Sequence, residues 1–105
     1  MDPIARWVKS PSSNVEQYTI AWTYNGGAAG TSTVPQSAAG DASGYSSDWA
    51  TSNPTITPTA GDVLSCSIVA VDTVNHLTST PLNLGPLTIP ATAPAPPASG
   101  TLTLS

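Results

Sequence analysis

Large apolar side chains alternate with small or polar ones most regularly in residues 15–24, VEQYTIAWTY. The large residues that share one face of this segment are Tyr18, Ile20, Trp22 and Tyr24. A period of two, built from aromatic and β-branched residues, is typical of a strand that packs one face into a core. We therefore predict a long strand here, with Trp22 in the core.

A second long strand is predicted over residues 62–72, after the turn-forming sequence TPTAG. The residues of this strand region able to line a buried face are Val63, Leu64, Cys66, Ile68, Ala70 and Val71. The polar bend DTVNH and a return strand follow. A turn, a long strand, a loop and a return strand are typical of a central strand in a β-sandwich.

Shorter strands are predicted before and between these two. Residues 4–9 lie between Pro3 and Pro11, which limit a strand and favour a sheet edge. Residues 25–27, NGG, predict a hairpin turn because Asn and Gly tolerate positive φ, and residues 30–35 form the returning strand.

The middle of the chain carries a weaker pattern. Residues 36–54 are small and polar, and they predict a long loop with one short strand near residues 45–50. Residues 55–58 predict another short strand around Ile56. The predicted core comprises Ile20, Trp22, Ile56, Leu64, Ile68 and Ala70.

The last strand begins at residues 76–80, is interrupted by Pro81 and continues over residues 82–89, as suits an edge strand. From Pro90 the sequence PATAPAPPASG is rich in Pro and predicts an extended, semi-rigid connector. It leads to TLTLS, in which Leu102 and Leu104 alternate with Thr.

These patterns predict an all-β protein, a sandwich of about seven strands. The domain comprises residues 1–89, and residues 90–105 form an extended arm or linker. We expect the arm to be an interaction element that presents Leu102 and Leu104 to another sheet edge. The alternatives are a frayed tail and a strand that docks on the sheet edge of its own domain.

The composition of the chain argues against several classes of binding partner. Charged residues make up 8% of the chain, against roughly a quarter in typical proteins, so hydroxyl and amide side chains carry its solubility. Two basic residues and a net charge of −4 argue against nucleic acid and against membranes as partners. The N-terminal sequence MDPIARWVKS has no apolar stretch of the signal-peptide type, and no apolar run approaches a membrane span.

Several of these segments resemble a known family. YTIAWTYNGG (18–27) resembles the Tyr-x-Val-x-Trp strand of fibronectin type III and related immunoglobulin-like domains, and TPTAGDVLSCSIVAVD (57–72) resembles their turn and following strand. Leu64 stands where those domains commonly have an aromatic residue, so no tyrosine-corner hydrogen bond is expected. The resemblance covers about residues 15–90, and IPATAPAPPASGTLTLS resembles a linker and the first strand of a following module.

The chain departs from this family at its start. If YTIAW is the third strand, the residues before it are too few for two strands and a turn. Either YTIAW is the second strand, or a strand comes from elsewhere. A small immunoglobulin-like protein with few charges and no signal peptide is similar to the accessory proteins of tailed-phage virions.

Residues with catalytic or metal-binding chemistry are few. Cys66 is the only cysteine, and its place in an apolar strand indicates a buried, unreactive thiol. His76 lies in a predicted loop without a motif that would supply a nucleophile, and no cofactor or metal site is predicted. Oxygen ligands for calcium are conceivable in two groups, where solvated carboxylates are the simpler interpretation: Asp62, Asp72 and Asn75, or Asp41 and Asp48.

Three aromatic residues outside the strongest strands are candidate contact residues. Trp7, Tyr45 and Trp49 are able to form a sugar-stacking or protein-binding surface, or to fold back over the sandwich. The leading hypothesis is a non-enzymatic accessory protein of a virion, a capsid decoration or tail component, that docks on protein partners by strands and extended ends. The alternative is a carbohydrate-binding or adhesive module of a larger exported protein at the cell surface, with surface glycans as its partner.

Overall fold

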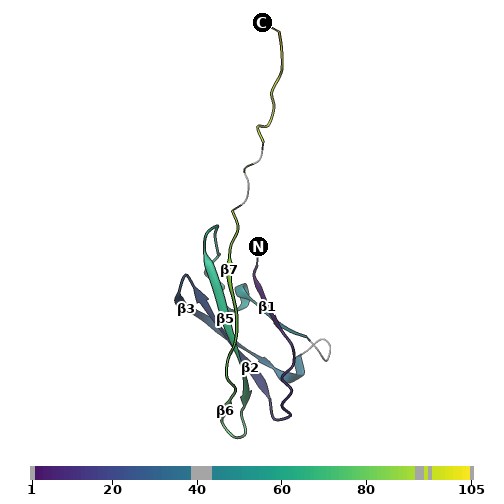
Figure 1. Cartoon of the computed structure of the whole chain (residues 1–105), viewed down its shortest axis with the longest axis vertical. Helices are drawn as coiled ribbons and strands as arrows, with labels where there is room; N and C mark the ends of the chain where they lie inside the picture. The colour runs from purple at the N-terminus through teal and green to yellow at the C-terminus, as the bar shows by residue number, and fades with distance from the viewer. Residues whose placement is uncertain (1, 39–43, 92–93, 95, 105) are drawn as a thin grey trace.

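Two antiparallel β-sheets pack on each other across a core of aromatic and aliphatic side chains (Figure 1). The computed structural model describes residues 2–38, 44–91, 94 and 96–104. In this part of the chain the larger sheet has the order β3-β2-β5-β6, with β7 also paired to β5, and the smaller sheet consists of β1 and β4. The all-β fold class is therefore confirmed, and the arrangement is compatible with a β-sandwich.

The elements of the described residues follow the chain in the order in which they are numbered. Their bounds are β1 (Ile4–Trp7), β2 (Gln17–Tyr24), β3 (Gly27–Pro35), the 3-10 turn η1 (Gln36–Ala38), β4 (Tyr45–Asp48), the single helical turn α1 (Trp49–Ser52), β5 (Val63–Asp72), β6 (Leu77–Thr78) and β7 (Leu82–Thr88).

The pairing of β2 with β5 forms the centre of the larger sheet. Ile20 pairs with Ile68 and Trp22 with Cys66, and all four side chains are buried on the same face. Since alternate residues of a strand point to opposite faces, Ala21 and Ser67, which lie between them, are on the other face of the sheet. Both long strands are confirmed, and Leu64, Cys66 and Ile68 face the core as predicted. Val63 and Val71 were also predicted to face inward, and this part is wrong: they alternate with the buried residues, and 37% of the surface of Val63 is exposed.

The turn between β2 and β3 is the hairpin turn that the sequence predicts. Asn25 and Gly26 both have positive φ, 49° and 84°, which Asn and Gly adopt most readily. The Asn25 side chain also ties this turn to the start of β5: its Oδ1 accepts the Val63 N–H at 2.8 Å, and its Nδ2 donates to Asp62 at 3.1 Å. The two hydrogen bonds of the Asn25 side chain therefore hold the hairpin turn against the start of β5.

The predicted strand at residues 55–58 is wrong, and Ile56 is not a core residue, since 37% of its surface is exposed. Its backbone is engaged locally, because its N–H donates to the Asn53 carbonyl and its carbonyl accepts the Trp49 indole N–H. A backbone bonded in this way has no groups left for a strand partner. The other predicted core residues are buried, except Ala70, which is half-buried against the core.

The structured part of the chain ends just beyond β7. The Ile89 N–H donates to the Asp62 carbonyl and its own carbonyl accepts the Gly61 N–H, both at 2.9 Å, and its side chain is buried. After Ile89 the described residues have no strand and are exposed, and Figure 1 shows the arm leading away from the two sheets.

Candidate functional site

Two mainly apolar hollows lie between β1 and β7, where the edges of the two sheets approach each other, and together they are called the groove. Their volumes are about 140 and 160 Å³. Ile4 and Ala5 of β1 line the first hollow together with Leu84 and Leu87 of β7. Trp7 of β1 and the adjacent Val8 line the second, together with Leu82. The hollows therefore follow one another along β1, and β7 runs past β1 in the opposite direction.

The groove exists because the smaller sheet stops at β1. This strand pairs with β4 from Ile4↔Asp48 to Trp7↔Tyr45, and no other described strand pairs with it. Its second edge therefore keeps backbone N–H and C=O groups free to pair with an added strand. Half-exposed or exposed apolar side chains border this edge: Ile4, Val8, Leu82 and Leu87.

The facing edge of β7 is less suited to pairing. Pro86 has no N–H to donate, Gly85 has φ of 97°, and the register against β5 shifts between Leu64 and Cys66. Proline and irregular register are features that blunt an edge strand. Of the two edges that flank the groove, β1 is therefore the one that offers a regular ladder.

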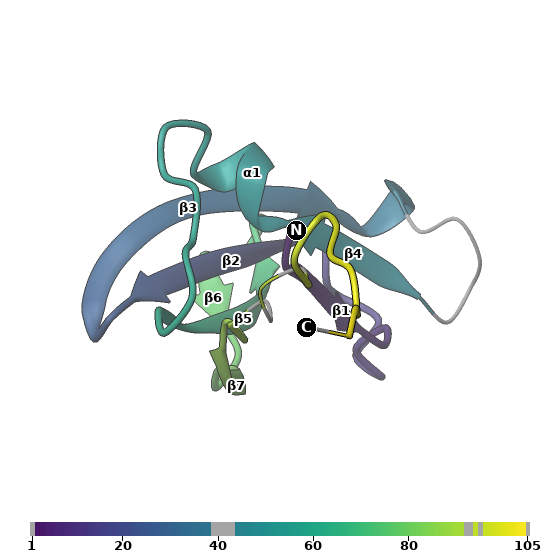
Figure 2. The ribbon, with the colours of Figure 1, turned by 90° about the horizontal axis from the view of Figure 1, so that it is seen from above.

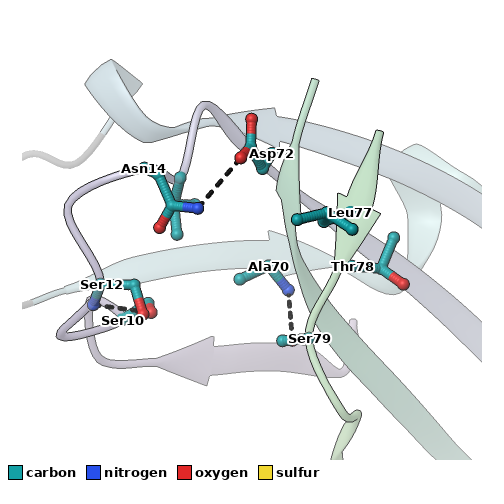
Figure 3. A pocket seen from close by; sticks show the side chains of 9 residues that line it. Ser10, Ser12, Asn14, Ala70, Asp72, Leu77, Thr78 and Ser79 are labelled. Atoms are coloured by element: carbon teal, nitrogen blue, oxygen red, sulfur yellow. Dashed lines mark hydrogen bonds between the residues drawn. The ribbon is translucent and has the colours of Figure 1, made fainter. Parts of the chain in front are cut away.

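A second, polar hollow of about 180 Å³ lies beside the β5–β6 turn and is lined by Ser10, Asn14, Asp72 and Ser79 among others (Figure 3). The Asp72 carboxylate accepts hydrogen bonds from the Asn75 side chain, the Asn75 and Val74 N–H groups and Asn14. These bonds, the Asn75 side chain first, lower the pKa of Asp72 from 3.8 to about 2. The carboxylate is fully used in fixing the turn, so this hollow carries no free acid or base from Asp72.

Asp62 plays the corresponding part at the other end of β5. Hydrogen bonds from the Thr59 N–H, the Tyr24 hydroxyl and the Asn25 amide lower its pKa to about 2. The hydrogen bond between Tyr24 and Asp62 also raises the pKa of the Tyr24 hydroxyl. Both groups are committed to the turn that precedes β5.

The two calcium groups have different outcomes. Asp62 and Asp72 lie at opposite ends of β5, about 30 Å apart at the usual rise per residue, so they cannot share one ion and that possibility is wrong. Asp41 lies outside the described residues, so its pairing with Asp48 stays untested. In the part of the chain that the structure describes, no three His, Cys, Asp or Glu side chains gather as metal ligands do.

His76 and Cys66 do not come together. Cys66 lies in the middle of β5, 5% exposed, and burial raises the pKa of its thiol. Its predicted burial is confirmed. His76 lies exposed in the turn after β5 with φ of 57°, so it is a turn residue as expected for its loop.

The structure corrects the prediction of a surface formed by Trp7, Tyr45 and Trp49, whose exposed fractions are 6%, 5% and 1%. Trp7 stacks on Tyr45 with ring centroids 5.8 Å apart, and Tyr18 packs against both. These rings hold the smaller sheet on β2 and have no open face for a sugar.

Trp49 is also buried by the packing of aromatic rings, at the other end of the core. Its ring packs edge-on against Trp22 at 5.3 Å, and its indole N–H donates to the Ile56 carbonyl at 2.7 Å. The helical turn α1 brings it there from a polar segment, beside β3 (Figure 2). The interpretation that a loop tryptophan folds back over the sandwich is therefore correct.

Leu102 and Leu104 have fully exposed side chains, at 100% and 102% of their reference surface. They lie on the arm, away from the three rings with which the sequence grouped them. Their role as contact residues stays a prediction.

Sequence reasoning missed the groove residues Ile4, Val8, Leu82 and Leu87. The sequence did indicate that the sheet is short of strands, because few residues precede residue 15. The described residues of that segment form one strand, β1. One strand there leaves the smaller sheet with an open edge.

No family model, no curated protein and no solved structure matches the chain. None of the helical segments among the described residues is long and apolar enough to cross a membrane.

Proposed function

We propose that this chain is a non-enzymatic structural module that joins a protein assembly through strand edges and its extended arm. The observation that carries the proposal is the fully exposed pair Leu102 and Leu104 on an arm that makes no strand in its own domain. Two exposed leucines on an extended segment are costly to leave in water and gain stability when a partner covers them.

The assembly we propose is a virion, with the chain as a capsid decoration or tail component. Low charge and a surface of hydroxyl and amide side chains support contact with protein surfaces over contact with nucleic acid. The burial of Trp7, Tyr45 and Trp49 removes the aromatic platform on which the carbohydrate-binding alternative depended.

We also propose that the sandwich is immunoglobulin-like or fibronectin type III-like. In those folds three strands, called C, F and G, form one sheet, and the strands called B and E are neighbours in the other. The pairing of β2, β5 and β7, with β1 and β4 opposite, supports this assignment.

Deletion of residues 91–105 tests the assembly role. The full chain and the truncated chain, each tagged, are used to capture partners from the source cells or particles under native conditions. We expect the melting temperature to change little, because the core lies within residues 4–89, while capture or self-association weakens. Equal capture by both chains would show that the arm is not the docking element, and a chain that stays monomeric and captures nothing contradicts the assembly role.

A further inference from the structure

We propose that the groove between β1 and β7 receives residues 101–104 from the arm of a second copy of this chain, as an added strand on the open edge of β1. This inference rests on the proposed function and names the docking site and its occupant. Each copy then offers one arm and one groove, a head-to-tail contact that builds a ring or a filament.

The arm matches the groove in length and period. β1 spans four residues, and its inward-facing residues Ala5 and Trp7 each line one of the two hollows. Leu102 and Leu104 are also two residues apart, so in a strand they lie on one face about 7 Å from each other. One leucine therefore stands opposite each hollow when the segment pairs with β1.

The hollows also match the side chains in character and size. Ile4, Leu84 and Leu87 line the first hollow and Val8, Ile68 and Leu82 the second. A cavity of roughly 150 Å³ with apolar walls accepts a benzene-sized group, so each hollow has room for the side chain of one leucine. The segment TLTL carries no charge that would have to be desolvated, and its threonines lie on the opposite face, toward solvent.

The other open edges fit this segment less well. In β3 the Gly30 N–H already donates to the Asn53 side chain at 2.6 Å, and the strand is composed mostly of small residues. In β7 the edge is interrupted at Pro86. Among the edges of β1, β3 and β7 in the described residues, that of β1 combines a regular free edge with an apolar groove.

The arm of the same copy is badly placed to fill this groove. β7 passes β1 in the opposite direction and ends beside its first residue, so the arm leaves at the open end of the groove and leads away (Figure 1). The sequence of residues 90–100 includes Pro90, Pro94, Pro96 and Pro97, and a fully extended connector of this length would span about 34 Å. To return, this connector would have to reverse its direction within that length, whereas the groove of a neighbour is reached without a reversal.

A peptide titration tests the site on the full chain. The receptor is the full-length L102D/L104D variant, labelled with nitrogen-15, and the probe is a peptide of residues 98–105. We expect amide shifts concentrated at residues 4–8 and 82–87. A probe peptide carrying the same two leucine-to-aspartate changes should bind about tenfold more weakly or worse, because it would bury carboxylates. The matched control, a peptide with T101D/T103D, adds the same charge on the solvent face and should bind nearly as well as the unmodified peptide.

Sedimentation of the full-length chain at rising concentration tests the second copy. The unmodified chain and T101D/T103D should associate, and L102D/L104D should stay monomeric. In the groove itself, Leu87→Arg should abolish association, while Val74→Arg, at an exposed apolar residue that lines neither hollow, should not. Folding of each variant is confirmed by its amide spectrum.

Four results overturn the inference. Peptide shifts confined to β3 or β6 would place the site elsewhere. The amide signals of residues 4–8 are also compared between the unmodified chain and L102D/L104D while both are monomeric. A difference between them would show that each arm fills its own groove. If L102D/L104D associates or captures partners as well as the unmodified chain, the inference fails while the assembly role stands; if no variant associates or captures anything, both fail.

Discussion

Replacing Trp49 with alanine separates a core role for this ring from a binding role at the surface. The side chain is 1% exposed, packs against Trp22 with ring centroids 5.3 Å apart, and donates its indole N–H to the Ile56 carbonyl at 2.7 Å. Removing a buried aromatic ring of this size costs about 3–5 kcal/mol, because the surrounding core closes only partly over the cavity. A domain of this size has about 5–15 kcal/mol of stability in total, so the loss is a large fraction of it.

Trp49→Phe is the matched control. It keeps an aromatic ring in the core but loses the hydrogen bond to the Ile56 carbonyl, so it should cost about 1–2 kcal/mol. In urea, with a slope of about 2 kcal/mol per molar, Trp49→Ala should lower the unfolding midpoint by about 2 M and Trp49→Phe by less than 1 M. A cost below 1 kcal/mol for Trp49→Ala, together with lost partner binding, would show that the ring works at the surface.

The remaining predictions concern a buried thiol, a close contact between β3 and α1, and two carboxylates. Thiol labelling of Cys66 should be slow in the native chain and fast in denaturant, since burial raises the pKa of this thiol; rapid native labelling would place the thiol at the surface. Gly30→Ala should cost about 1–3 kcal/mol in urea melts, because its Cβ would overlap the Ser52 carbonyl oxygen, whereas Gly27→Ala on the same strand meets nothing nearer than 3.6 Å and should be nearly neutral. Asp62 and Asp72 have pKa values lowered to about 2 from 3.8, so their ionised forms stabilise the folded state; the unfolding free energy should hold from pH 7 to about 5 and fall from about pH 4 to 2, and a flat profile there would refute their role in the turns.

The alternating pattern predicted the centre of the larger sheet well. β2, β5, the hairpin at Asn25 and the edge strand β7 are found where the sequence placed them, because period-two patterns and Asn-Gly turns act over a few neighbouring residues. The buried thiol of Cys66 followed from the same alternation.

Residues 44–62 were predicted less well because the burial of Tyr45 and Trp49 depends on the rings of Trp7 and Trp22, which are far away in the sequence. Trp49 and Tyr45 come from polar segments, yet the core needs their volume and their polar atoms find backbone carbonyls at Ile56 and Gln36. Ile56 looked like a core residue by composition, but its backbone is used by the turn after α1. The sequence indicated a shortage of strands before residue 15, but the position and the lining of the groove depend on how the strands pair.

Amide hydrogen exchange in β1 of the full-length chain is the most direct measurement of the central claim, that the smaller sheet is completed by the arm of another copy. At low concentration the amides of residues 4–8 should exchange faster than those of β5, because one edge of β1 is open. At concentrations where the chain associates, protection of residues 4–8 should rise about tenfold or more in the unmodified chain and in T101D/T103D, and stay low in L102D/L104D. Association that leaves the exchange of residues 4–8 unchanged would contradict the claim.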